Sequence, residues 1–358
     1  MLRVTLQQIK EKNDDITKGK SSDVVTIRDV ARAANVTGIT VSRALNGNAP
    51  VAKATRLRIE KAARDLGYVP NRLATALRSG QTKTIGILWS LGGPHIGVQL
   101  VNDMVRRAQK HGYVSQVCDF MWFSNLKDVL TDYAQRRIDA VIIEWPHSDI
   151  MEYTEQLSKF SAVVLVPSTS LETTFDQIVL DRCQAICEVA DHFVKTKRKH
   201  PVYLSAEVPQ TSKVKAFLKR LHKHGLCDSD HYFIPVSHRP SDQSHGEAYL
   251  RAISTAWNKS RPFDAILCTT DEGAAALMYW LQKQGYRVPQ DVAVVGFNDN
   301  SQSQYMNPSL ASVDRRNNQL ADLIEKMHFA RLKAPHQPPQ KEKIAMKFIC
   351  RESAELPK

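Results

Sequence analysis

The sequence predicts two architectures in one chain: an all-α N-terminal head with a helix-turn-helix and a hinge helix, then an α/β body with parallel sheets. Three observations support this prediction. Between residues 25 and 66, apolar residues recur at helical spacing, with capping residues at the breaks. From residue 84 onward, short apolar runs alternate with amphipathic stretches. Residues 1–83 carry 16 Lys and Arg against seven Asp and Glu, within a chain of net charge +12.

The first helix is defined by its capping residues. Thr26 precedes an apolar run and Asp29 follows three residues later, which is the spacing of a capping box. We therefore expect the helix to begin at Ile27 and to end at Asn35, a residue type that tolerates the left-handed conformation. One helical face collects the apolar residues Ile27, Val30, Ala31 and Ala34.

A second helix follows after a tight turn. Thr37 is its predicted cap, and the helix spans 38–45 with Val41 and Leu45 on the buried side. The outward side chains are short apart from one arginine, which suits a helix lying in a groove about 12 Å wide. The pair of helices therefore indicates a helix-turn-helix with DNA as its partner. The outward residues are Gly38, Ile39, Ser42 and Arg43.

A third helix and a hinge complete the predicted head. Residues 53–66 carry the apolar positions of a helix that Gly67 ends, although Ala52 is a poor cap. Asn71 begins a further segment of about two turns that ends at Gly80. A helix this short is marginal alone in water, so we expect it to fold only against a partner. The apolar positions of the third helix are Leu57, Ile59, Ala62, Ala63 and Leu66.

The composition indicates a nucleic-acid partner and a location in the cytoplasm. A basic head on a nearly neutral body is typical of a module that displaces phosphate counterions. The six cysteines form no CxxC pair, so free thiols in a reducing cytosol are expected. Residues 1–22 lack the apolar core of a signal peptide, and no run of 18 apolar residues occurs. We therefore expect a disordered leader and a cytoplasmic protein with no membrane partner.

From residue 84 onward, the alternation of short apolar runs with amphipathic stretches is typical of open parallel sheets that helices cover on both faces. About two such units fit into residues 84–350. Ligands of these sheets bind beyond the carboxyl ends of the strands, so the loops there are the predicted pocket walls. The expected strands are 84–90, 140–143, 162–166, 202–205, 265–268 and 292–297, and the clearest helices are 99–111, 183–196 and 272–285.

The run from Thr26 to Gly80 resembles the DNA-binding head and hinge of the LacI/GalR (lactose/galactose repressor) family. The signatures DVA, TVSR-x-LN, TR and GY-x-PN follow in order over about 55 residues without a gap. The resemblance implies a transcriptional regulator, most often a repressor, that binds near-palindromic double-stranded operator DNA as a homodimer. It also implies that paired hinge helices form on DNA and open the central minor groove.

The DNA-contacting positions of the family are carried over one by one. By this resemblance, Arg43 reads a base edge, and Gly38 and Ile39 occupy the pair that sets operator preference. Ala74 and Leu77 match the minor-groove pair, with Leu77 as the wedge. The positions implied to contact phosphate or to anchor a helix are Thr26, Thr37, Thr40, Ser42, Asn46 and Asn71.

The body is similar to the two-lobed, periplasmic-binding-protein-like domain of the same family, in which three strand crossovers join the lobes. Matching segments include 263–266, 288–297 and 351–353. The expected domains are a leader (1–22), a helix-turn-helix domain (23–69), a hinge helix and linker (70–83), and an effector-binding and dimerisation domain (84–358). Within that domain, we expect lobe one at about 84–179 and 308–338, and lobe two at about 180–307 and 339–358. The last strand is expected at 344–350, in lobe two.

The predicted pocket departs from the family pattern. Lys213 replaces an arginine, Thr270 an asparagine and Asn298 an aspartate. Lys213 offers a point charge where the arginine offers a guanidinium fork, and Asn298 lacks the carboxylate of the aspartate. Both changes weaken recognition of the vicinal hydroxyls of a neutral sugar. The sequence therefore predicts an effector that is anionic or differently shaped from a standard sugar. The residues expected to contact it are His95, Lys213, Thr270 and Asn298, with Trp89 or Trp145 as a stacking wall.

Two other interpretations stay open at this point. A regulator with the same head and a degenerate pocket would bind DNA without effector control. An enzyme built on such lobes would need a catalytic motif, but GxSxG, HExxH, GxxxxGK[ST] and GxGxxG are all missing from the sequence. We therefore assign no catalytic residue, cofactor or metal, and expect a protein that is not an enzyme.

Overall fold

The computed structural model divides into two compact units, one ending at Gly80 and the other beginning at Gln81. The expected leader, residues 72–75, 77 and 78 of the expected hinge, and the candidate residues Ala74, Leu77 and His95 lie outside the residues that the structure describes. Those described are 25–46, 50–71, 76, 79–89, 98–119, 125–145, 148–205, 211–226, 232–237, 245–257 and 263–355.

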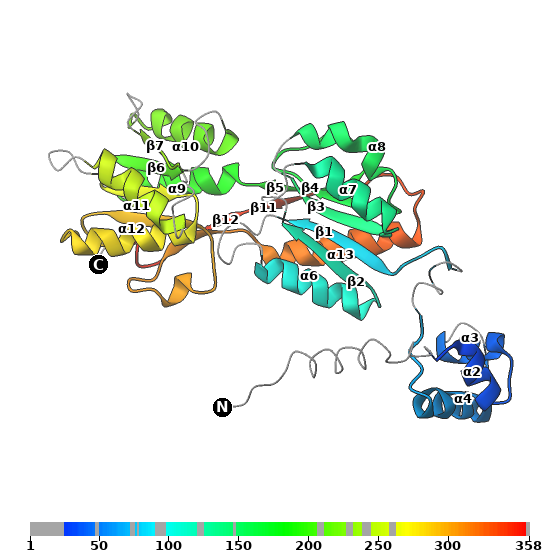
Figure 1. Ribbon diagram of the computed structural model, residues 1–358. Helices are drawn as coiled ribbons and strands as arrows, with labels where there is room; N and C mark the ends of the chain where they lie inside the picture. Colours follow the sequence, from blue (N-terminus) through cyan, green and yellow to red (C-terminus); the bar gives the residue numbers. More distant parts are fainter. Residues whose placement is uncertain are drawn as a thin grey trace, which may run out of the picture. The chain divides into compact units, whose positions relative to one another are not determined.

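Three helices form the head (Figure 1). They are α2 (Ile27–Ala33), α3 (Gly38–Asn46) and α4 (Lys53–Asp65), and they match the expected helices closely. The fully buried core combines Val30, Val41 and Ile59, one from each helix. Leu57 and Leu66 were expected on the apolar face of α4 but are 55% and 39% exposed, because α4 turns Ile59 and Ala63 toward the core that α2 and α3 form.

The first sheet of the body has six parallel strands. Their order is β11 (Lys341–Ala345), β5 (Asp176–Asp181), β4 (Ala162–Val166), β3 (Ala140–Glu144), β1 (Thr84–Trp89) and β2 (Val114–Asp119). One face packs on α6 (Val98–Lys110) and α13 (Asn317–Lys333). The other face packs on α7 (Leu126–Gln135) and α8 (Thr154–Leu157), as Figure 1 shows.

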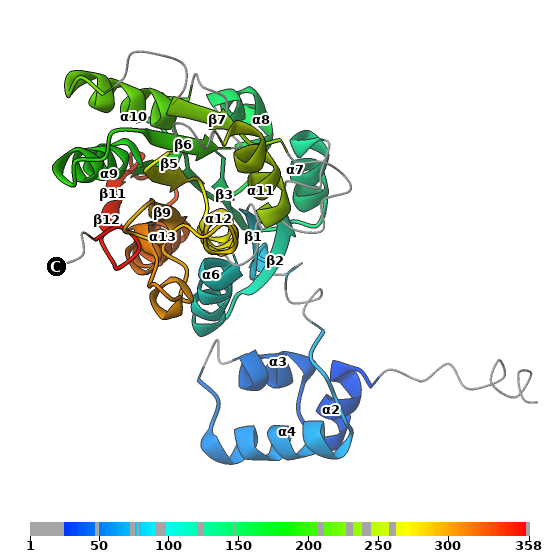
Figure 2. The ribbon, with the colours of Figure 1, turned by 90° about the vertical axis from the view of Figure 1, so that its left-hand side faces the viewer.

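The second sheet has the same plan with one antiparallel edge. Its order is β12 (Lys347–Ile349), β10 (Ala311–Asp314), β9 (Ala293–Asn298), β8 (Ala265–Cys268), β6 (Pro201–Ser205) and β7 (Phe233–Pro235), with β12 antiparallel to β10. The helices α9 (Cys183–Lys195) and α10 (Ser212–Lys223) cover one face. The other carries α11 (His245–Ala256) and α12 (Asp271–Lys283), as Figure 2 shows. The two doubly wound lobes confirm the predicted fold class.

Three segments of chain connect the two sheets, and two of them correct the expected lobe boundaries. Strand β10 pairs with β9, so residues 311–314 belong to the second lobe, although 308–338 was expected in the first. Strand β11 pairs with β5, so residues 341–345 belong to the first lobe, although 339–358 was expected in the second. The chain changes lobe at Met346, so the single expected strand 344–350 is two strands in different sheets.

A buried ion pair holds β11 in its place. Asp176 is fully buried at the start of β5, and its carboxylate accepts hydrogen bonds from Nε and Nη2 of Arg331 at 2.9 and 2.7 Å. The same guanidinium donates to the backbone carbonyls of Pro335 and Pro338, at 3.1 and 2.9 Å. This bidentate pair therefore fixes the connection that leads from α13 into the edge of the first sheet.

None of the helices in the described part of the chain is long and apolar enough to cross a membrane.

His328 is the most deeply buried titratable side chain of α13. It is 1% exposed, and neither ring nitrogen has a hydrogen-bond partner among the described residues. Burial lowers the pKa of His328 to about 4, because the charged imidazolium would lose its hydration there. The folded protein therefore holds this histidine neutral at pH values where an exposed histidine would be charged.

His328→Leu should reduce the acid sensitivity of the fold. In the unfolded chain the pKa of His328 returns to its ordinary value of about 6.5. Stability is therefore fully present above that pH and is lost as the pH falls toward about 4, by up to about 3 kcal/mol from this residue. Urea unfolding at roughly neutral pH and at about pH 5 should show a smaller acid loss in the variant than in the wild type. His336→Leu, at an exposed histidine, is the control, and equal losses in wild type and His328→Leu would contradict the prediction.

Candidate functional site

The first helix of the head begins with a closed hydrogen-bond ring. The backbone N–H and the hydroxyl of Thr26 both donate to the carboxylate of Asp29, at 2.9 and 2.7 Å. These bonds, together with the nearby charge of Arg32, lower the pKa of Asp29. The capping box predicted from the spacing of Thr26 and Asp29 is thus confirmed, and it fixes where α2 begins.

The turn between α2 and α3 is set by Asn35. Its φ is +47°, in the left-handed region. The N–H groups of Asn35 and Val36 donate to the carbonyls of Arg32 and Ala31, at 3.2 and 3.0 Å, which is the bond pattern of a Schellman motif. The left-handed conformation expected at Asn35 is confirmed, although α2 itself ends earlier, at Ala33, with Ala34 as its C-cap. The turn determines the direction in which α3 starts.

Helix α3 is capped by Thr37. The hydroxyl oxygen of Thr37 accepts the N–H of Thr40 at 3.3 Å and lies 2.9 Å from the Thr40 hydroxyl. Val41 and Ala44 are buried against the other two helices. The cap and the buried residues therefore determine which face of α3 is outward.

The outward face of α3 carries the residues expected to reach base edges. Ile39 is 66% exposed, and Arg43 is exposed as well. A Cβ added at Gly38 would meet no atom within 4 Å, so this position is open. The expected phosphate-contacting or anchoring residues Thr26, Thr37 and Asn71 are exposed, and Thr40 and Ser42 are half-buried. Asn46 is the last residue of α3.

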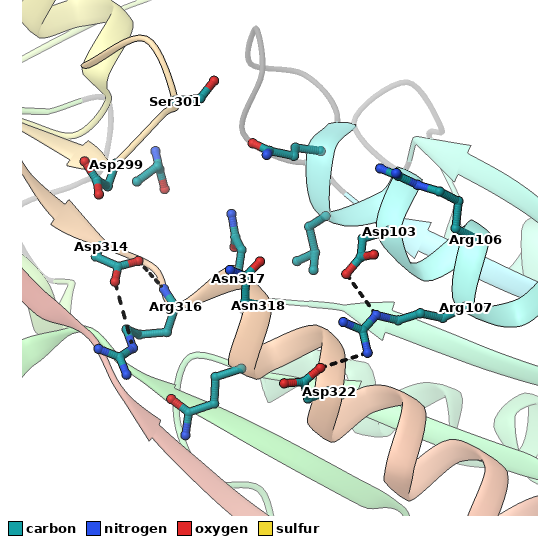
Figure 3. A pocket seen from close by; sticks show the side chains of 14 residues that line it. Asp103, Arg106, Arg107, Asp299, Ser301, Asp314, Arg316, Asn317, Asn318 and Asp322 are labelled. Atoms are coloured by element: carbon teal, nitrogen blue, oxygen red, sulfur yellow. Dashed lines mark hydrogen bonds and ion pairs between the residues drawn. The ribbon is translucent and has the colours of Figure 1, made fainter. Parts of the chain in front are cut away.

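A cleft of about 750 Å³ lies between elements of both lobes (Figure 3). The first lobe contributes α6 and the start of α13, and the second lobe contributes the segment after β9. Most of its charges are already paired: Arg107 contacts Asp103 at 2.9 Å and Asp322 at 2.8 Å. The lining is Gln99, Leu100, Asp103, Arg106, Arg107, Asn298, Asp299, Ser301, Asp314, Arg316, Asn317, Asn318, Gln319 and Asp322.

Two of the expected effector residues meet at the end of β9. Asn298 lines the cleft, is 8% exposed and has a φ of +105°, a conformation that side-chain-bearing residues rarely adopt. Nζ of Lys213 lies 5.1 Å from the ring centre of Phe297, the residue before Asn298. The structure therefore brings Lys213 close to the strand end that holds Asn298.

The other described effector candidates have structural contacts. The Thr270 hydroxyl accepts the N–H of Gly273 at 3.0 Å and so caps α12. The indole N–H of Trp145 donates to Asp149 at 2.6 Å. Trp89 is fully buried, with Cζ of Arg315 at 5.7 Å from its ring centre. These three residues do not line the cleft of Figure 3.

Sequence reasoning missed a charged cluster at the carboxyl end of the first sheet. Glu144 ends β3 and is 6% exposed, and it forms ion pairs with Arg315 and, at 3.7 Å, with Arg182. Both arginines lie in segments that connect the lobes, after β10 and after β5. A charged residue at the end of an apolar strand was the available signal, but the expected strand stopped at Ile143.

Comparisons with known proteins match both parts of the chain. Residues 26–71 match the family model "Bacterial regulatory proteins, lacI family", and residues 190–354 match "Periplasmic binding protein-like domain". Catabolite control protein A of Priestia megaterium is 27% identical over 81% of this chain and 87% of its own length. The transcriptional repressor PurR of Mannheimia succiniciproducens is 24% identical over 90% and 95%. A crystal structure of the lac repressor dimer bound to operator and an anti-inducer shares the fold, with a TM-score of 0.76, 21% identity, and 92% and 99% coverage.

Thr37→Ala should loosen the start of α3. The Thr40 N–H would lose its acceptor, which costs about 1 kcal/mol, so its hydrogen exchange should be roughly fivefold faster. Thr37→Ser keeps the oxygen and is the control. Unchanged exchange at Thr40 in the alanine variant of the full chain would show that Thr37 does not cap the helix.

Proposed function

The chain belongs to the LacI/GalR family of DNA-binding transcriptional regulators, and we propose that it is a cytosolic repressor that acts as a homodimer on near-palindromic operator DNA. A small molecule bound between the lobes controls it. The observation that carries the proposal is the outward face of α3, which presents Ile39 and Arg43 to solvent beside the open position at Gly38. We propose no enzymatic activity, since regulators of this family act by binding.

Arg43 is the proposed base-reading residue of this face. A guanidinium fork can donate two hydrogen bonds to the acceptors O6 and N7 of guanine. Ile39, with no polar atom in its side chain, is suited to contact a thymine methyl group. Gly38 contributes no side chain, so its role is to let the helix backbone approach the DNA.

Arg43→Ala should weaken binding to the selected operator by about 1–3 kcal/mol and leave binding to shuffled DNA nearly unchanged. The measurement is a fluorescence titration of both duplexes at one moderate salt concentration. Arg32→Ala is the control, because it removes an equal charge from the exposed surface of α2. Equal losses on the two duplexes in Arg43→Ala would mean that Arg43 contacts only phosphate.

The proposed homodimer is supported by exposed aromatic residues on the second lobe. Tyr279 on α12 is 60% exposed, and Tyr305, at the end of the short helix η4 (Ser303–Tyr305), is 81% exposed. A hydrogen bond of 3.3 Å from the Gln282 side chain to the carbonyl of Asn307 joins the two segments. Large exposed apolar groups of this kind are typical of protein interfaces.

Replacing Tyr279 and Tyr305 together by serine should weaken self-association. Losing two aromatic contacts should raise the dimer dissociation constant at least about tenfold, as measured by analytical ultracentrifugation without DNA. Ile39→Ser removes an equally exposed apolar side chain from the head and should leave self-association unchanged. A double variant that dimerises like the wild type would remove this surface from the proposal.

The proposed effector site combines residues of both lobes. Asn298 and Lys213 are near the same strand end, and Asn298 also lines the cleft. We propose that they contact the effector together with His95 and Thr270, and that Trp89 or Trp145 forms a wall. The lysine and the neutral amide favour an anionic effector over a neutral sugar.

A further inference from the structure

Two buried N–H groups at the carboxyl end of the first sheet have no hydrogen-bond partner among the described residues. They are Nε1 of Trp89 and Nε of Arg315, whose side chains are in contact through the face of the indole ring. Trp89 is fully buried and Arg315 is 5% exposed. Buried donors in folded proteins are nearly always paired, so two such donors in one place indicate a missing acceptor.

The charges around these donors favour an anion. Glu144 is paired with Arg315 and, at 3.7 Å, with Arg182, so Arg315 shares the charge of this carboxylate with a second guanidinium. Of the acidic residues next to the two arginines in the chain, Asp181 pairs with Lys343 at 2.7 Å and Asp314 accepts the N–H of Arg316 at 2.7 Å. Both therefore have partners of their own. A buried guanidinium that shares its carboxylate with a second arginine is stabilised further by an additional anion.

A buried acceptor lies on the same segment of chain. Oδ1 of Asn317 has no partner among the described residues, and Asn317 stands two residues beyond Arg315, where α13 begins. Figure 3 shows Asn317 in the cleft between the lobes. An amide oxygen in this position can accept a hydrogen bond from a ligand hydroxyl.

We propose that these residues form a subsite for a small hydroxycarboxylic acid of the sugar-acid class, which extends from Asn317 in the cleft to the two buried donors outside the cleft lining. The carboxylate accepts from Trp89 and Arg315, and a hydroxyl of the same ligand donates to Asn317. The inference rests on the proposed function, because it specifies the effector of that site. It also places the ligand on the segment between β10 and α13, which connects the two lobes.

Calorimetric titration of the full-length dimer tests the subsite. The probes are the sugar acids D-gluconate, D-galacturonate and D-glucarate, the matched neutral compounds sorbitol and galactose, and glucose 6-phosphate. At least one sugar acid should bind, about tenfold or more tightly than its neutral counterpart and the phosphate.

Two variants remove one donor each and leave the net charge unchanged. Trp89→Phe deletes the indole N–H, and Arg315→Lys deletes Nε while keeping a cation beside Glu144. Each should weaken binding of the acid about tenfold, and thermal unfolding should show that both still fold. Trp257→Phe is the matched control, because its indole N–H donates to the Tyr286 hydroxyl at 3.3 Å in the second lobe, and it should bind the acid like the wild type.

Three results would overturn the proposal. They are no binding of any sugar acid at millimolar concentration, binding of a neutral sugar or the phosphate at least as tight as the acid, and undiminished acid binding in both Trp89→Phe and Arg315→Lys. Titration of the same preparations with selected operator DNA separates the two claims. Sequence-specific DNA binding without acid binding refutes the subsite alone, whereas loss of specific DNA binding refutes the proposed function.

Discussion

The small apolar core shared by α2, α3 and α4 fixes the direction in which the outward face of α3 points. The function of the head depends on this core. Val30, Val41 and Ile59 are fully buried in this core. Because Val41 is held inward, the helical period places Ile39 and Arg43 outward. Nε of Arg58 on α4 also donates to the carbonyl of Ala34 at 2.9 Å, which ties the third helix to the end of the first. The orientation of the outward face of α3 is thus a consequence of packing on the opposite side of the same helix.

The body is organised around a different constraint, the burial of charge where the lobes connect. Glu144, Arg182 and Arg315 join the end of β3 to two of the three connecting segments. Separating buried charges costs more than separating exposed ones, because water cannot replace the lost partner. Any rearrangement of the lobes therefore has to preserve these contacts or exchange them for others. This is the physical reason why a ligand at the same place would influence the arrangement of the lobes.

Local chemistry was sufficient to predict the head from the sequence. Thr26, Asp29 and Asn35 set the ends of α2 through contacts within a few residues, and Thr37 does the same for α3. The two lobes also followed from strand-helix alternation. The sheet to which β10 belongs, and the sheet to which β11 belongs, did not. The place of β11 beside β5 depends on Asp176 and Arg331, which are 155 positions apart, and no local pattern reports such a contact. The candidate effector residues show the same limit: Thr270 has the residue type of a ligand contact, but the structure uses its hydroxyl as a helix cap.

We propose above all that two copies of the head read two related half-sites in DNA. Selection of bound duplexes from a random pool by the full-length protein, followed by sequencing, tests it directly. We expect enrichment of one motif made of two inverted half-sites at fixed spacing, in which the half-sites carry the discriminating bases. A pool that stays unenriched after repeated rounds, or a motif with a single half-site, would contradict it.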